Sequence, residues 1–168
     1  SAITTGPDGR FSMAGLPPGT HVFSVNRRED GHYARAVVEV SGGSNVSVQL
    51  TLQPAMSFSG RLMFEGATPA PSVFGRRIPV RALAGGAGAV TPQMSATDQR
   101  GAFTVTHVAP GRYLLGGPLS FGPTADTMTW SLQSVIVDGR DMTDLPIDLV
   151  NEPPKDVVVT YGDRFQEL

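Results

Sequence analysis

Apolar and polar residues alternate along several short segments of this chain. The clearest is 46–52, which reads VSVQLTL, and residues 56–64 repeat the pattern around Gly60. A period of two is typical of a β-strand with one buried and one wet face. Apolar-rich segments predict further strands at 33–40, 78–83, 132–137 and 157–161. No segment has helical periodicity, so we expect an all-β fold.

The distribution of glycine and proline agrees with this prediction. Twenty glycines and fourteen prolines are spread along the 168 residues rather than clustered. Such spacing is expected where many short strands are joined by tight turns, and it interrupts nearly every window long enough for a helix.

A motif occurs twice, 92 residues apart. Residues 8–11 read DGRF and lead to LPPG at 16–19, while 100–103 read RGAF and lead to VAPG at 108–111. Six positions match without a gap, pairing Gly9, Phe11, Leu16, Pro18, Gly19 and His21 with Gly101, Phe103, Val108, Pro110, Gly111 and Tyr113. The first glycine predicts a tight turn, the phenylalanine a core residue of the next strand, and Pro-Gly a second turn.

This pattern resembles the carboxypeptidase regulatory-like domain, a transthyretin-like (prealbumin-like) seven-stranded sandwich. The stretch FSGRL at 58–62 resembles that family's opening strand, and WSLQSV at 130–135 with DGRD at 138–141 resembles the later part of long bacterial versions. The resemblance covers nearly the whole chain. It implies tandem Greek-key β-sandwich modules (transthyretin-like or Ig-like) and says almost nothing about activity.

The spacing of the repeat predicts how the modules divide. Gly101 follows Ser57 by 44 residues, whereas only eight residues precede Gly9. We therefore expect residues 1–54 to form a first module that lacks its opening strands. Residues 55–162 are expected to form a complete second module with a long loop at 116–130, and 163–168 to begin a following linker or module. A protein partner or a neighbouring module is expected to complete the first sandwich.

Charge and composition exclude several classes of function. The net charge of −2 gives no long-range attraction to a nucleic-acid backbone. Without cysteine, the chain forms neither a disulfide nor a thiolate metal site. No apolar run approaches the ~18 residues needed to cross a bilayer. The lack of cysteine fits a bacterial envelope protein. The resemblance to tandem modules of large bacterial envelope proteins implies an extracytoplasmic location: periplasmic, cell-surface or secreted.

No residues stand at the spacing of a catalytic or cofactor site. The histidines His21, His32 and His107 have no partner at metal-ligand spacing, and neither an H-E-x-x-H helix nor a G-x-S-x-G elbow occurs. The parent carboxypeptidases need a zinc-binding catalytic domain, which nothing here matches. We expect no enzyme activity and no cofactor.

Three groups of residues are candidates for binding. Asp138, Asp141 and Asp144 have oxygen ligands that suit calcium, although Asx-type turns are the expected role of this cluster. In the 116–130 loop, Phe121 and Trp130 offer rings for a sugar or a protein partner; alternatively, Trp130 covers one end of the core. Arg76 and Arg77 are candidates for an anion site, with a solvated strand edge as the alternative.

These observations favour a non-catalytic structural or interaction module of a larger extracytoplasmic multidomain protein. Two alternatives remain open. One is an accessory subunit docked on a larger membrane-associated or filamentous assembly, and the other is a carbohydrate-binding module.

Overall fold

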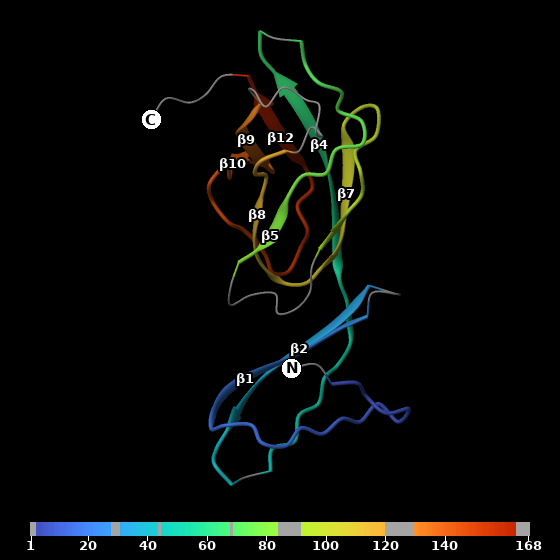
Figure 1. Ribbon diagram of the computed structural model, residues 1–168, viewed down its shortest axis with the longest axis vertical. Helices are drawn as coiled ribbons and strands as arrows, with labels where there is room; N and C mark the ends of the chain where they lie inside the picture. Colours follow the sequence, from blue (N-terminus) through green and yellow to red (C-terminus); the bar gives the residue numbers. More distant parts are fainter. Residues whose placement is uncertain are drawn as a thin grey trace.

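The computed structural model describes residues 3–27, 31–43, 45–67, 69–83, 92–119 and 130–163. Across these ranges all regular secondary structure is β-strand, arranged in three sheets, which confirms the all-β prediction. The same residues include no helix with the length and apolar character needed to cross a membrane. The molecule is elongated, with a small N-terminal part (residues 3–54) at one end and a larger C-terminal part (residues 55–163) at the other (Figure 1).

The C-terminal part contains two sheets. The larger has the order β10(Arg140–Asp141), β9(Ser131–Val137), β12(Val157–Gly162), β4(Met56–Glu65), β7(Ala102–Val108) and β6(Gln93–Met94). The smaller has the order β11(Ile147–Leu149), β8(Gly111–Leu115) and β5(Val80–Ala82). All neighbours are antiparallel except β12 and β4, which run parallel.

One hydrophobic cluster joins the two sheets of the C-terminal part. It includes Leu62, Val105 and Val159 from the larger sheet and Tyr113 and Leu149 from the smaller one. The buried positions alternate with exposed ones along β4, as the period-two pattern predicts. Two sheets that enclose one core are consistent with a β-sandwich.

The N-terminal part consists of a single three-stranded sheet. Strands β1(Gly19–Arg27) and β2(His32–Val40) form a long antiparallel hairpin, and β3(Gln53–Pro54) adds two residues to its edge. Among its described hydrophobic residues only Ala34 and Val38 are buried. Phe11 is half-buried, so the expectation that it fills a core as Phe103 does is met only in part. The physical reason is that the described residues form no second sheet against this hairpin.

One strand prediction was wrong. Residues 46–52 show the strongest alternation in the chain, yet they belong to no sheet. Alternation gives a segment two different faces, but a strand also needs a backbone partner. The predicted strands at 33–40, 56–64, 132–137 and 157–161 lie on β2, β4, β9 and β12.

Both copies of the repeated motif fold into the same turn. Gly9 and Gly101 have positive φ angles of 75° and 79°. In each copy the N–H of the glycine donates to the carbonyl oxygen of the residue three positions earlier. The N–H of that earlier residue donates to the carbonyl oxygen of the residue four positions after it, which closes the turn. The bonds are Gly9 N to Gly6 O (2.9 Å) and Gly6 N to Arg10 O (2.8 Å), matched by Gly101 N to Asp98 O (3.1 Å) and Asp98 N to Ala102 O (2.9 Å).

A second hydrogen bond is also common to the two copies. The Tyr113 hydroxyl donates to the carbonyl oxygen of Ala109 at 2.7 Å. At the matching place, His21 Nε2 donates to the carbonyl oxygen of Pro17 at 2.8 Å. Both side chains reach back four residues and fasten the Pro-Gly turn to the strand that follows it.

Candidate functional site

Two aspartates of the 138–148 segment, Asp138 and Asp141, accept hydrogen bonds from backbone N–H groups. Asp138 Oδ1 accepts the N–H groups of Lys155 and Asp156, both at 2.9 Å. Asp141 Oδ1 accepts the N–H of Thr143 at 3.0 Å and also its hydroxyl, and these two bonds hold the pKa of Asp141 below its usual value. Among the described residues, no three acidic or histidine side chains gather in a way that could hold a metal ion. Asp141 therefore caps a local Asx-type turn, whereas Asp138 fastens its turn to the distant segment that contains Lys155 and Asp156.

Trp130 packs on the core of the C-terminal part. Its ring meets Phe64 edge-to-face, with centroids 5.1 Å apart and planes at 78°. The side chain is half-buried and lies against the main hydrophobic cluster. The face of a sugar platform has to be free, so this contact favours a packing role. Phe121, its proposed companion, lies outside the described residues.

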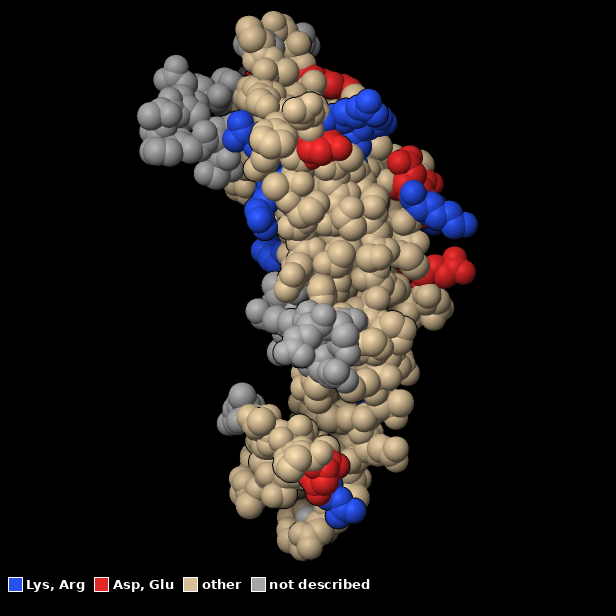
Figure 2. Space-filling view, turned by 90° about the vertical axis from the view of Figure 1, so that its right-hand side faces the viewer, with Lys and Arg blue, Asp and Glu red and all other residues tan. Residues whose placement is uncertain are grey.

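The paired arginines hold one peripheral segment in place. Arg76 Nε donates to the carbonyl oxygen of Ser72 at 3.0 Å, and Arg77 Nη1 donates to that of Met94 at 3.1 Å. The Arg76 N–H also donates to the buried hydroxyl of Thr97 at 2.7 Å. On the face shown in Figure 2, most of the surface is uncharged; acidic and basic side chains lie close together towards the right-hand edge, and basic side chains alone line the left-hand edge. The hydrogen bonds of Arg76 and Arg77 to carbonyl oxygens favour a structural role over an anion site.

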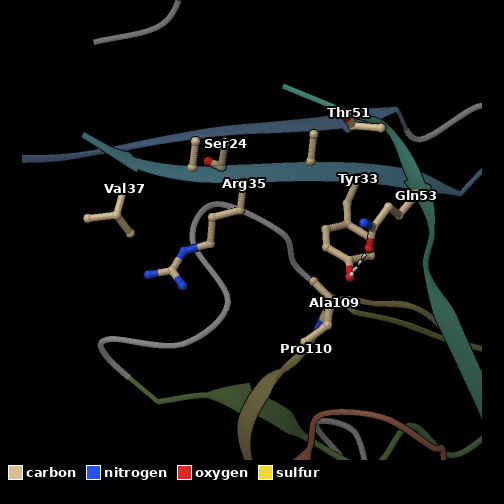
Figure 3. A pocket seen from close by; sticks show the side chains of 10 residues that line it. Ser24, Tyr33, Arg35, Val37, Thr51, Gln53, Ala109 and Pro110 are labelled. Carbon is tan, nitrogen blue, oxygen red and sulfur yellow. Dashed lines mark hydrogen bonds between the residues drawn. The ribbon is translucent and has the colours of Figure 1, made fainter. Parts of the chain in front are cut away.

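A small cavity lies where the two parts meet. Tyr33 and Arg35 extend from β2 on the side of the turn that contains Ala109 and Pro110 (Figure 3). The Tyr33 hydroxyl donates to Gln53 Oε1 at 3.4 Å, and burial raises the Tyr33 pKa. The cavity measures about 260 Å³, which is below the roughly 300–1,000 Å³ typical of small-molecule pockets. It is a junction between the two parts rather than a ligand site.

The N-terminal part contains a much larger apolar opening. Two adjoining hollows of about 420 and 780 Å³ share Phe11, Met13, Leu16 and Phe23 in their walls. Leu50 lines the smaller hollow, and Val38, Val46 and Val48 line the larger one. The rings of Phe11 and Phe23 pack with centroids 5.8 Å apart. We call this opening the N-terminal groove.

The walls of the N-terminal groove have unused backbone groups. Residues 11–16 and 45–52 join no strand ladder and make no backbone–backbone hydrogen bond to another described residue. In the second copy of the motif the corresponding segment is β7, which is paired on both sides, by β4 and β6. Apolar side chains combined with unpaired backbone are the properties of an incomplete sheet.

Sequence reasoning did not single out Met13, Phe23 or Leu50, which line this groove. The signal that could have found two of them was the repeat itself, because the offset of 92 aligns Met13 with Val105 and Phe23 with Leu115. No family model, curated protein or solved structure matches the chain. The repeated turn and the N-terminal groove are therefore the main pointers to its function.

Proposed function

We propose that this chain is a non-catalytic structural and interaction region of a larger extracytoplasmic multidomain protein. In this proposal it consists of two tandem Greek-key β-sandwich modules of the carboxypeptidase regulatory-like type, residues 1–54 and 55–162. A protein partner or a neighbouring module completes the first. The observation that supports it best is the repeat: both copies share the same turn bonds, yet among the described residues only the second copy has strand partners.

An interaction role suits the chemistry of the N-terminal groove. Its walls contain many apolar side chains, and residues 11–16 and 45–52 of these walls make no backbone–backbone hydrogen bond to another described residue. An exposed sheet edge binds an extended peptide through main-chain hydrogen bonds, with side-chain pockets supplying selectivity, and these two segments offer groups of the same kind. An accessory subunit of a larger assembly would use the same surface. The packing of Trp130 on Phe64 gives the carbohydrate-binding alternative no support.

Cysteine labelling in cells tests this proposal, because the chain contains no cysteine of its own. Ser47→Cys places a thiol beside the N-terminal groove, and Glu152→Cys places the matched control at an exposed position in the C-terminal part. In cells with an intact cytoplasmic membrane, a membrane-impermeant maleimide should label Cys at 152 readily. The thiol at 47 should react only after denaturation, because the groove is occupied.

Two outcomes would overturn the proposal. If neither thiol reacts until the cytoplasmic membrane is broken, the location is wrong. If both react equally fast in intact cells, the groove is open in the cell and the interaction role is wrong.

A further inference from the structure

We propose that the N-terminal groove takes up a β-strand with the pattern apolar–x–Gly–x–apolar, and that its glycine lies opposite Phe11. This inference rests on the proposed tandem-module function and specifies the partner's chemistry. The occupant is an extended protein segment that the described residues of the N-terminal part do not supply.

Strand β4 provides the template for this occupant. It lies between β7 and β12, antiparallel to the first and parallel to the second. Phe58 and Leu62 of β4 are buried in the core, and Gly60 between them pairs with Phe103 of β7. The strand therefore supplies two apolar side chains and a bare glycine on one face.

The offset of 92 transfers this geometry to the N-terminal part. The register Gly60↔Phe103 and Phe58↔Val105 becomes a pairing of the occupant with Phe11 and Met13. Both residues line the N-terminal groove, and their segment has no ladder partner. Residues 45–52 form the other wall, where apolar and polar residues alternate. An inserted strand would satisfy the backbone groups of both walls.

The two turn glycines show that room exists for such a strand. A Cβ atom added at Gly101 would overlap the carbonyl oxygen of Leu62 in β4, whose N–H donates to Gly101 O at 2.8 Å. A Cβ atom added at Gly9 would meet no atom within 4 Å. The volume that β4 occupies beside the second turn is thus open beside the first.

The requirement for glycine comes from the ring opposite. A Cβ atom at Gly60 would lie 2.5 Å from Cζ of Phe103 and 2.7 Å from the carbonyl oxygen of Val157. Phe11 occupies the matching position in the first copy. A branched residue opposite Phe11 would therefore push the inserted strand away from residues 10–16.

A synthetic peptide tests the inference directly. The probe is the segment 56–65 of this chain, MSFSGRLMFE, flanked by lysines for solubility. Added in excess to the full chain, it should slow amide hydrogen exchange at residues 10–16 and 45–52 by tenfold or more. The same peptide with Gly60→Val should bind at least tenfold more weakly by fluorescence anisotropy. Equal binding of the two peptides, or no added protection with either, would overturn the inference.

Two protein variants and a tether sharpen the test. Met13→Asp puts a charge in the groove and should abolish peptide binding, whereas Leu145→Asp, at an exposed position of the C-terminal part, should leave it unchanged. Tethering the probe sequence ahead of residue 1 by a flexible linker raises its effective concentration to the millimolar range. The tethered probe with its glycine should slow amide hydrogen exchange at residues 10–16, and the tethered probe with Gly60→Val should not. If neither tethered probe slows exchange there, the inference is overturned.

The two proposals fail in different ways. If the thiol at position 47 is shielded in cells but no β4-type peptide binds, the interaction role stands and the strand inference is wrong. If peptides bind in vitro but the thiol at 47 labels freely in cells, the groove has the proposed selectivity and the proposed function is wrong.

Discussion

Gly9 and Gly101 hold the same place in the repeated turn but have different surroundings. Both have positive φ, which costs an L-residue roughly 1–2 kcal/mol. Only Gly101 is also crowded by the backbone of Leu62. We expect Gly101→Ala to lower the free energy of unfolding of the C-terminal part by more than the backbone cost alone.

Trp130, the single tryptophan, lies in the C-terminal part and reports on its unfolding in urea. Gly9→Ala is the matched control, because it has the same positive-φ cost without a clash against a neighbouring backbone. It also lies outside the C-terminal part, whose unfolding Trp130 reports. Its tryptophan-monitored transition should not move. Equal shifts in the two variants would contradict the different packing of the two turns.

The Tyr113 hydroxyl satisfies a buried acceptor, and this makes a second prediction at the residue scale. Tyr113→Phe leaves the carbonyl of Ala109, itself buried, without its donor. Such an orphaned group costs about 1–3 kcal/mol, so the urea midpoint should fall accordingly. The matched variant His21→Phe removes an exposed bond and should cost less than ~1 kcal/mol. A larger loss for His21→Phe than for Tyr113→Phe would refute this explanation.

Two tyrosines make the stability of the C-terminal part sensitive to alkali. Burial raises the pKa values of Tyr113 and Tyr161 to about 12, whereas the pKa of an unfolded tyrosine is about 10. The folded chain therefore holds these protons more tightly. Its stabilisation is complete below pH 10 and is lost as the pH rises toward 12. Urea midpoints measured from pH 8 to 11.5 should fall above pH 10, and less steeply in a Tyr113→Phe, Tyr161→Phe double variant.

At the scale of elements, the sequence predicted strands better than it predicted pairing. Apolar richness located β9, and the period-two pattern located β4 because its two faces differ in burial. The same pattern failed at 46–52, since alternation says nothing about a missing neighbour. It also could not show that β4 and β12 lie side by side in parallel, because the paired residues are almost 100 positions apart in the chain.

The candidate site was predictable to different degrees. Asx-type capping by Asp141 follows from short-range turn chemistry, and the structure has that bond to the Thr143 N–H. The bonds that Asp138 accepts from Lys155 and Asp156 join segments distant in the chain, so local turn chemistry could not predict them. The contact of Trp130 with Phe64 joins distant segments and could only be guessed as packing. The spacing of the repeat predicted that the first module is incomplete, but it did not identify the residues of the N-terminal groove, because Met13, Phe23 and Leu50 look like ordinary core residues.

Ladder pairing should control hydrogen exchange in the two copies of the motif. Residues 102–108 pair with β4 along most of their length and with β6 at Val105 and Thr106, so amides in this ladder should be strongly protected. Residues 10–16 have no ladder partner and should exchange at least a hundredfold faster. Exchange measured by mass spectrometry on the free chain compares the two segments within one sample. Similar protection of both would mean that residues 10–16 already have a strand partner.

At the scale of the whole molecule, apolar burial is unevenly divided between the two parts. The C-terminal part has a continuous core that joins two sheets, with Val105, Val135 and Tyr161 fully buried. The N-terminal part buries Ala34 and Val38 and leaves Val22 and Val37 about half exposed. Since stability scales with apolar area removed from water, most of the folding free energy belongs to the C-terminal part.

The connection between the parts is slight, and this leads to the last prediction. The N–H of Ala55 donates to the Gly31 carbonyl at 2.7 Å, and the Ala109–Pro110 turn borders the small junction cavity. We expect two calorimetric transitions, the lower from the N-terminal part. A chain cut to residues 55–163 should keep the upper transition, with its tryptophan-monitored urea midpoint unchanged, and lose the lower one. A peptide that fills the N-terminal groove should raise the temperature of the lower transition only, since ligand binding stabilises the unit that binds it. A single transition shared by all probes, or a cut chain that fails to fold, would mean that the two parts form one cooperative unit.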